Sequence, residues 1–218
     1  MLQPSQYLHR PWPKHFNTID SVRFLSWDLA LKATPLGWEA EEAATLHYIR
    51  LHTTIPVPGV YAQADGHGSR YLLMDRVEGE NLELAWHHLN DEQRDAIAEQ
   101  LQDYVFQLRA LPPMHGLRVC AVNGGALRDS RITSTGKIGP FADEAEFNDF
   151  IVPMAESFIC TEILEETRRR MRDNHQVVFT HGDLAPRNIL VKGSQIVAVL
   201  DWAQAGWLPE HWELVKAM

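Results

Sequence analysis

A short stretch near the carboxyl end carries side chains that could perform phosphoryl transfer. The sequence HGDLAPRNILV occupies residues 181–191, and VLDW occupies residues 199–202. Phosphoryl transfer is catalysed mainly by positioning and charge: one carboxylate orients the acceptor hydroxyl, and hard oxygen ligands hold a divalent ion. Asp183, Asn188 and Asp201 supply these groups. We therefore predict that the three side chains converge on one point.

A plain turn is the alternative interpretation of this stretch, because Asp and Asn are common turn residues. Three features together favour a site: the HxDxxxxN-like spacing, a second Asp after a hydrophobic strand, and apolar runs on both sides of the loop. Those runs, 177–179 and 189–191, are expected to be strands that anchor the loop.

A second group of residues is expected upstream, because a cation must hold the nucleotide phosphates and a carboxylate must hold that cation. Lys32 ends the apolar run 29–31, and Glu42 lies in the Glu-rich segment that follows, with Glu39 and Glu41 as alternatives. Ordinary surface charge would also explain a lysine followed by glutamates. The order of these residues before Asp183 favours the functional interpretation.

The first third of the chain must supply the elements that position Lys32. The apolar pattern predicts a hairpin over 22–33 with its turn at 26–28, a helix over 38–53, and a strand over 70–75. Residues 75–80 are predicted to be a hinge. The fold class expected is α+β with two lobes: a small β-rich first lobe and a mainly helical second lobe.

The rest of the chain reads as helices followed by the strands that flank the catalytic stretch. A long amphipathic helix is predicted from residue 90 to the prolines at 112–113, and further helices over 144–151 and 156–173. Residues 115–140 show no clear period and are predicted to be a long loop. The expected units are an N-terminal arm at 1–16, a nucleotide-binding first lobe at 17–78, and a second lobe at 79–218 with the catalytic loop and acceptor site.

Composition excludes several classes of protein. The 218 residues carry a net charge of −9, which argues against a nucleic-acid partner. The amino terminus lacks the apolar core of a secretory signal, and no run approaches the ~18 apolar residues of a membrane span. Two cysteines do not make a disulfide scaffold. We expect a cytoplasmic protein without a membrane or nucleic-acid partner.

The segment HGDLAPRNILV…VLDW resembles the catalytic core of the aminoglycoside phosphotransferase/choline kinase family, a branch of the protein-kinase-like fold. The resemblance runs from about residue 22 to the end. Several further segments of the sequence are similar to phosphotransferase-like proteins of filamentous fungi. The other segments that carry it are EEAATLHYIRLHTTIPVPGVY, YLLMDRVEGENLELAW, VNGGALRDSRI, IGPFADEAEFNDFI and GWLPEHWELVKA.

The resemblance implies an ATP- and Mg²⁺-dependent kinase that phosphorylates a hydroxyl of a small molecule. It implies that Asp183 is the catalytic base, that His181 braces the loop, and that Asn188 and Asp201 hold magnesium. Lys32, paired with Glu42, would contact the α- and β-phosphates. The strand end and hinge would bind adenine through backbone groups; these residues are Met74, Asp75, Arg76 and Val77.

Two departures from the family pattern leave other functions open. The segment HFNTIDSVRF, which should cover the phosphates, has no glycine, and the chain ends at Met218, soon after Asp201, so we expect a shortened second lobe. The alternatives are a nucleotide-binding pseudokinase or scaffold, and a pocket repurposed for other chemistry in a biosynthetic pathway. Net charge suggests an acceptor that bears an amine.

Several aromatic and acidic residues beside the expected acceptor side have two interpretations. Trp202, Trp207 and Trp212 are expected to pack in the core rather than stack on a substrate ring. Glu210 and Glu213 could attract an amine or belong to a solvated surface.

Overall fold

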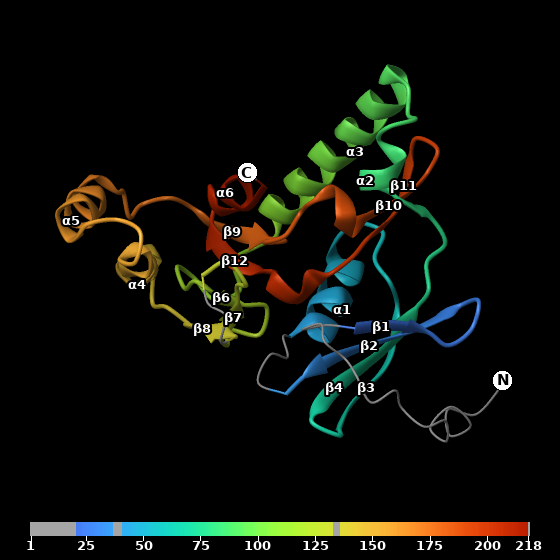
Figure 1. The fold of residues 1–218 in the computed structure, drawn as a ribbon, viewed down its shortest axis with the longest axis horizontal. Helices are drawn as coiled ribbons and strands as arrows, with labels where there is room; N and C mark the ends of the chain where they lie inside the picture. Colours follow the sequence, from blue (N-terminus) through green and yellow to red (C-terminus); the bar gives the residue numbers. More distant parts are fainter. Residues whose placement is uncertain (1–20, 37–40, 133–135, 218) are drawn as a thin grey trace.

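The computed structural model describes residues 21–36, 41–132 and 136–217 (Figure 1). The predicted N-terminal arm, most of the expected phosphate-covering segment and Glu39 lie outside these residues. The first lobe is built on a four-stranded antiparallel sheet in the order β1-β2-β4-β3. Its strands are β1 (Ser21–Phe24), β2 (Leu29–Pro35), β3 (Val60–Gly66) and β4 (Ser69–Asp75).

Helix α1 (Glu42–His52) lies between β2 and β3 in the sequence. It begins four residues later than the predicted helix over 38–53. Its buried residues include Leu46 and Ile49, which join a core shared with the sheet and the second lobe. The β1–β2 hairpin and its tight turn are where the sequence predicts them, because the alternating pattern and the polar Ser26 and Asp28 both specify that geometry.

The second lobe contains the remaining helices and several small antiparallel sheets (Figure 1). The helices are α2 (Leu82–Ala85), α3 (Asp91–Ala110), α4 (Glu144–Ile151), α5 (Thr161–Arg170) and α6 (Trp212–Ala217). One sheet has the order β6-β12-β9 and another the order β11-β10-β5. Their strands are β5 (Glu80–Asn81), β6 (Cys120–Ala121), β9 (Val177–Thr180), β10 (Ile189–Lys192), β11 (Gln195–Val199) and β12 (Gly206–Pro209).

Helix α3 follows from a strong start signal in the sequence. The Asn90 side chain accepts the backbone N–H of Gln93, and the Gln93 side chain accepts the backbone N–H of Asn90, which is a capping box. The helix buries Ile97, Tyr104 and Leu108 along one face. This confirms the predicted helix to within a residue at each end.

Two predictions for the second lobe need correction, and one strand was not predicted. The region 115–140 is not a structureless loop: β6 pairs with β12, and β7 (Leu127–Arg128) pairs with β8 (Lys137–Ile138). Strands of two residues carry no detectable period, so the sequence did not reveal them. Helix α5 is shorter than the predicted 156–173, and β12, with glycine and proline at its ends, was not predicted.

The tryptophans of the carboxyl-terminal part are core residues, as predicted. Trp202 and Trp207 are each 1% exposed, and Trp212 is also buried. The indole N–H of Trp202 donates to the carbonyl of Val199 at 2.9 Å, which satisfies its buried polar atom. None of the helices in the described part of the chain has the length and hydropathy needed to cross a membrane.

Candidate active site

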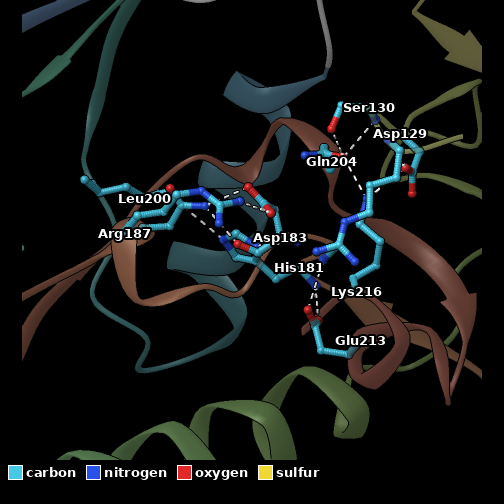
Figure 2. A network of polar contacts seen from close by, with 12 residues as sticks. Asp129, Ser130, His181, Asp183, Arg187, Leu200, Gln204, Glu213 and Lys216 are labelled. Atoms are coloured by element: carbon cyan, nitrogen blue, oxygen red, sulfur yellow. Dashed lines mark hydrogen bonds and ion pairs between the residues drawn. The ribbon is translucent and has the colours of Figure 1, made fainter. Parts of the chain in front are cut away.

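The loop between β9 and β10 carries two of the predicted polar residues, Asp183 and Asn188; Figure 2 shows Asp183 beside Arg187. Asn188 donates from Nδ2 to the carboxylate Oδ2 of Asp183 at 2.9 Å and to the backbone carbonyl of Asp183 at 2.8 Å. Both side chains are buried. The two strands that flank the loop belong to different sheets, so the loop is held from both ends.

Asp201 lies two residues after β11, next to a contact between that segment and the β9–β10 loop. The backbone N–H of Leu200 donates to the carbonyl of Asn188 at 2.8 Å, so the residue before Asp201 is tied to the catalytic loop. Asp201 itself adopts a left-handed backbone conformation with φ 60°. Such a conformation is uncommon for a residue with a side chain and is found at functional turns.

His181 forms hydrogen bonds with the loop and with the residue that follows β11. It is 0% exposed, its Nδ1 accepts the backbone N–H of Asp183 at 3.1 Å, and its ring contacts the carbonyl of Leu200 through Nε2 at 3.0 Å. Because Nδ1 accepts, Nε2 must carry the proton and donate. Burial lowers the pKa of His181 below its ordinary value, although nearby Glu213 pulls the pKa upward. The neutral ring therefore joins the loop to the residue that follows β11 through two hydrogen bonds.

Glu213, in α6, holds the first residues of the loop. Its carboxylate accepts the backbone N–H of His181 at 2.6 Å and that of Gly182 at 3.2 Å (Figure 2). Gly182 has φ +77°, and a Cβ at this position would lie 2.5 Å from the carbonyl oxygen of Gln204. The chain needs glycine here for both reasons. Glu213 is thus engaged by the backbone, which corrects the expectation of an amine-attracting or merely solvated carboxylate.

Lys32 connects the two lobes through two carboxylates. Its Nζ lies 2.8 Å from Oε2 of Glu42 and 2.7 Å from Oδ1 of Asp201. Lys32 and Glu42 are buried, whereas the Asp201 side chain is 39% exposed. Burial raises the pKa of Asp201, but the charge and hydrogen bond of Lys32 outweigh it, so the pKa lies below its ordinary value.

Of the two candidate glutamates that the structure describes, Glu41 and Glu42, it is Glu42 that pairs with Lys32. It is the first residue of α1, so its side chain projects toward the sheet that carries the lysine. Glu41 precedes the helix, and its carbonyl accepts hydrogen bonds from Thr45.

The predicted adenine-binding segment lies between the lobes, with some of its backbone already occupied. The N–H of Asp75 donates to the carbonyl of Gly59, and the N–H of Arg76 donates to the carbonyl of Asp28. Met74 is buried in the sheet, and Val77 is half-buried. The amides of Asp75 and Arg76 are therefore not available to a base, which leaves Val77 and the backbone carbonyls.

Sequence reasoning missed residues that contact the loop from outside the motif positions. Arg187 donates to Oδ1 of Asp183. Its signal was its place four residues after Asp183. A buried network behind the loop was also missed: Lys216 lies 2.8 Å from Oδ1 of Asp129 and 3.1 Å from Oε1 of Gln204 (Figure 2). Such contacts between distant segments leave no local pattern.

Taken together, the site offers two carboxylates and an amide oxygen near a buried ammonium group. Oδ1 of Asn188 has no hydrogen-bond partner among the described residues; both bonds of this side chain are made by Nδ2. Oxygen atoms of this kind suit Mg²⁺, and a lysine beside them suits phosphate.

Comparison with known proteins agrees with this geometry. The sequence model of the phosphotransferase enzyme family matches residues 20–218. A subtelomeric hrmA-associated cluster protein, present in two strains of Aspergillus fumigatus, is 35% identical over 77 residues. That alignment covers 32% of this chain and 15% of the relative.

Solved structures share the fold at low sequence identity. The aminoglycoside phosphotransferase APH(4)-Ia superposes with a TM-score of 0.62 at 14% identity, over 92% of this chain and 68% of that chain. A mutant of it in complex with ADP and hygromycin B gives 0.59 over 86% of this chain and 63% of that chain. The gentamicin complex of APH(2")-IIa gives 0.60 at 14% identity, over 90% and 65%. The two-lobed kinase-like fold is confirmed, and this chain spans about two thirds of the length of these structures.

Proposed function

Since the chain belongs to the phosphotransferase enzyme family, we propose that it transfers the γ-phosphoryl group of ATP to a hydroxyl group of a small molecule. The observation that carries the proposal is the double contact of Lys32. One ammonium group bonds a carboxylate of the first lobe, Glu42, and a carboxylate of the second, Asp201. A surface lysine would have no reason to be buried between them.

The donor set supports magnesium as the metal. The carboxylate of Asp201 and Oδ1 of Asn188 are hard oxygen donors, the type that Mg²⁺ prefers. Mg²⁺, when bound with ATP, would neutralise charge on the β- and γ-phosphates. Lys32 would add its charge to the phosphates while Glu42 keeps it in position.

The proton acceptor that we propose is Asp183. We assign it the role of accepting the hydroxyl proton as the acceptor oxygen bonds to the γ-phosphorus and the bond from that phosphorus to the bridging oxygen breaks, which leaves ADP. Asn188 and Arg187 hold its carboxylate in place. His181 fixes the backbone beneath it and does not itself touch the reacting atoms.

We also propose an acceptor that bears an amine, a cytoplasmic location and no nucleic-acid partner. An amine on the acceptor rests on the net charge of −9, since Glu213 is occupied by backbone amides. A cytoplasmic location and the lack of a nucleic-acid partner rest on the sequence alone. All five expected side chains are present: Lys32, Glu42, Asp183, Asn188 and Asp201. Their presence supports catalysis over a pseudokinase or a repurposed pocket.

The test compares the wild type with Asp183→Asn. Each protein is incubated with Mg·ATP and a panel of hydroxylated amines, and products heavier by one phosphoryl group are measured by mass spectrometry. We expect Asp183→Asn to lower turnover by about 10²–10⁴-fold, with the melting temperature still raised by Mg·ATP. The exposed Asp95→Asn on α3 is the matched control and should behave as wild type. Equal turnover by Asp183→Asn would refute the assigned role.

A further inference from the structure

Three side chains capable of binding a metal meet outside the catalytic loop. Glu144 is the first residue of α4, His175 lies just before β9, and His211 lies between β12 and α6. Strands β9 and β12 pair antiparallel, with Val177 opposite Pro209 at one end and Thr180 opposite Gly206 at the other. The cluster is at the Val177 end, and the catalytic loop follows Thr180. The two sites are therefore separated by the length of the strand pair.

The ligand atoms of the three residues lie within 4.8 Å of one another. Nδ1 of His175 is 2.7 Å from Oε1 of Glu144, and Nδ1 of His211 is 4.0 Å from the same oxygen. Glu144 is 3% exposed. Its second oxygen, Oε2, accepts the backbone N–H of His175 at 2.8 Å, which fixes the direction of the carboxylate. Such an outer hydrogen bond is what orients a metal ligand.

His211 supplies an independent sign that something is missing from this cluster. Its Nδ1 is buried and has no hydrogen-bond partner among the described residues. Buried polar atoms are nearly always satisfied, so an orphan requires an explanation. An imidazole nitrogen in this position can offer its lone pair to a cation.

We propose that Glu144, His175 and His211 bind one Zn²⁺ ion. Two imidazoles and a carboxylate are a ligand set typical of zinc and unsuited to Mg²⁺. Bonds of about 2.0–2.1 Å in tetrahedral geometry place donor atoms roughly 3.3 Å apart. The observed 2.7 Å and 4.0 Å lie on either side of that spacing, so small side-chain rotations suffice.

Binding changes one proton position and leaves a coordination site for water. The carboxylate can only accept, so Nδ1 of His175 donates a hydrogen to Glu144 in the metal-free protein. Zinc takes the place of that hydrogen, and the proton moves to Nε2 or to solvent. A water completes the four ligands. The ion would tie α4 to both strands of the β9–β12 pair, so its effect is on stability and does not depend on phosphoryl transfer.

The experiment uses the untagged full chain, stripped of metal with a chelator. Zinc is titrated in competition with a chromophoric chelator, metal content is measured after gel filtration, and the melting temperature is followed. We expect one equivalent of zinc and a rise in melting temperature. His211→Ala should weaken zinc binding by about tenfold or more and remove that rise. Nδ1 of His211 has no hydrogen-bond partner to lose among the described residues, but its ring packs on that of His175 at a centroid distance of 4.6 Å, so each protein is compared with its own metal-free form and only the zinc-dependent rise is read.

The exposed His87→Ala is the matched control and should bind zinc as the wild type does. A second readout is the visible spectrum of Co²⁺ bound in place of zinc, which reports tetrahedral coordination and should be lost in His211→Ala. The proposal is overturned if the wild type retains no zinc after gel filtration. It is also overturned if His211→Ala binds zinc as tightly as the wild type, or if His87→Ala weakens binding equally.

Discussion

Removing the carboxylate of Glu213 should loosen the catalytic loop without touching a residue that contacts substrate. In Glu213→Ala, the backbone N–H groups of His181 and Gly182 lose their acceptor, and both residues are buried. An unsatisfied buried donor costs about 1–3 kcal/mol. Two such donors would cost ~2–6 kcal/mol, and water entering beside the half-exposed α6 reduces this to about 2–4 kcal/mol.

Glu213→Gln separates the two bonds. The amide keeps one oxygen acceptor and loses the charge, so about half of the destabilisation should remain. The assay is urea unfolding followed by tryptophan fluorescence, with ATP turnover measured in parallel. Turnover should fall in the same order as stability, because His181 and Gly182 carry Asp183.

Glu210→Ala is the matched control for this series. Glu210 is a neighbouring acid whose hydrogen bonds are made by its backbone, so its side chain should contribute less than about 0.5 kcal/mol. The reasoning is refuted if Glu213→Ala unfolds within about 0.5 kcal/mol of the wild type, or if Glu210→Ala loses as much stability as Glu213→Ala.

Three further predictions address the lysine, the glycine and the histidine of the site. Lys32→Met leaves Glu42 and the half-exposed Asp201 without their cation, so we expect a loss near the lower end of ~3–5 kcal/mol in urea unfolding and a weaker affinity for ATP in calorimetry. Gly182→Ala places a Cβ 2.5 Å from a carbonyl oxygen at positive φ, and it should lower the free energy of unfolding by more than ~2 kcal/mol. Gly193 also has positive φ but has open space around it, so Gly193→Ala should cost only about 1–2 kcal/mol. Equal losses of stability would contradict the steric argument. His181 stays neutral in the folded protein because burial lowers its pKa. At low pH the unfolded chain therefore binds one more proton than the folded chain, and the free energy of unfolding should fall as pH drops below about 6.5. A urea midpoint that does not change between about pH 7.5 and 5.5 would contradict this.

The loop that carries Asp183 was predictable because its polar residues and the apolar runs beside it are close together in the sequence. Asp183 and Asn188 share one loop between two apolar strands, and such a pattern fixes both the elements and the side chains they carry. The helix from Asp91 was predictable for the same reason, since its cap and its apolar face are both local.

The choice of partner for Lys32 could only be narrowed by sequence. The sequence offers Glu39, Glu41 and Glu42 as partners. Of the two that the structure describes, Glu42 is the first residue of α1 and pairs with Lys32. Helix α1 begins four residues after the predicted start, so the local pattern did not fix which glutamate would face the lysine.

Contacts that join distant segments were not predictable. Glu213 lies in α6, yet its carboxylate serves the backbone of residues 181–182, and nothing nearby in sequence announces the pairing. The same holds for Lys216 and Asp129, a buried ion pair between the carboxyl end and the β7 segment. Neither contact could be predicted, because each depends on the tertiary fold and not on a local repeat or a helix cap.

The most direct measurement of the central claim is the affinity for ATP with and without magnesium, determined by calorimetry. If Asp201 and Asn188 hold the ion beneath the phosphates, the wild type should bind ATP more tightly with Mg²⁺, and Asp201→Asn should lose that gain while the exposed Asp95→Asn keeps it. Binding of ATP that is equally tight with and without magnesium in the wild type, or an unchanged magnesium effect in Asp201→Asn, would contradict the account.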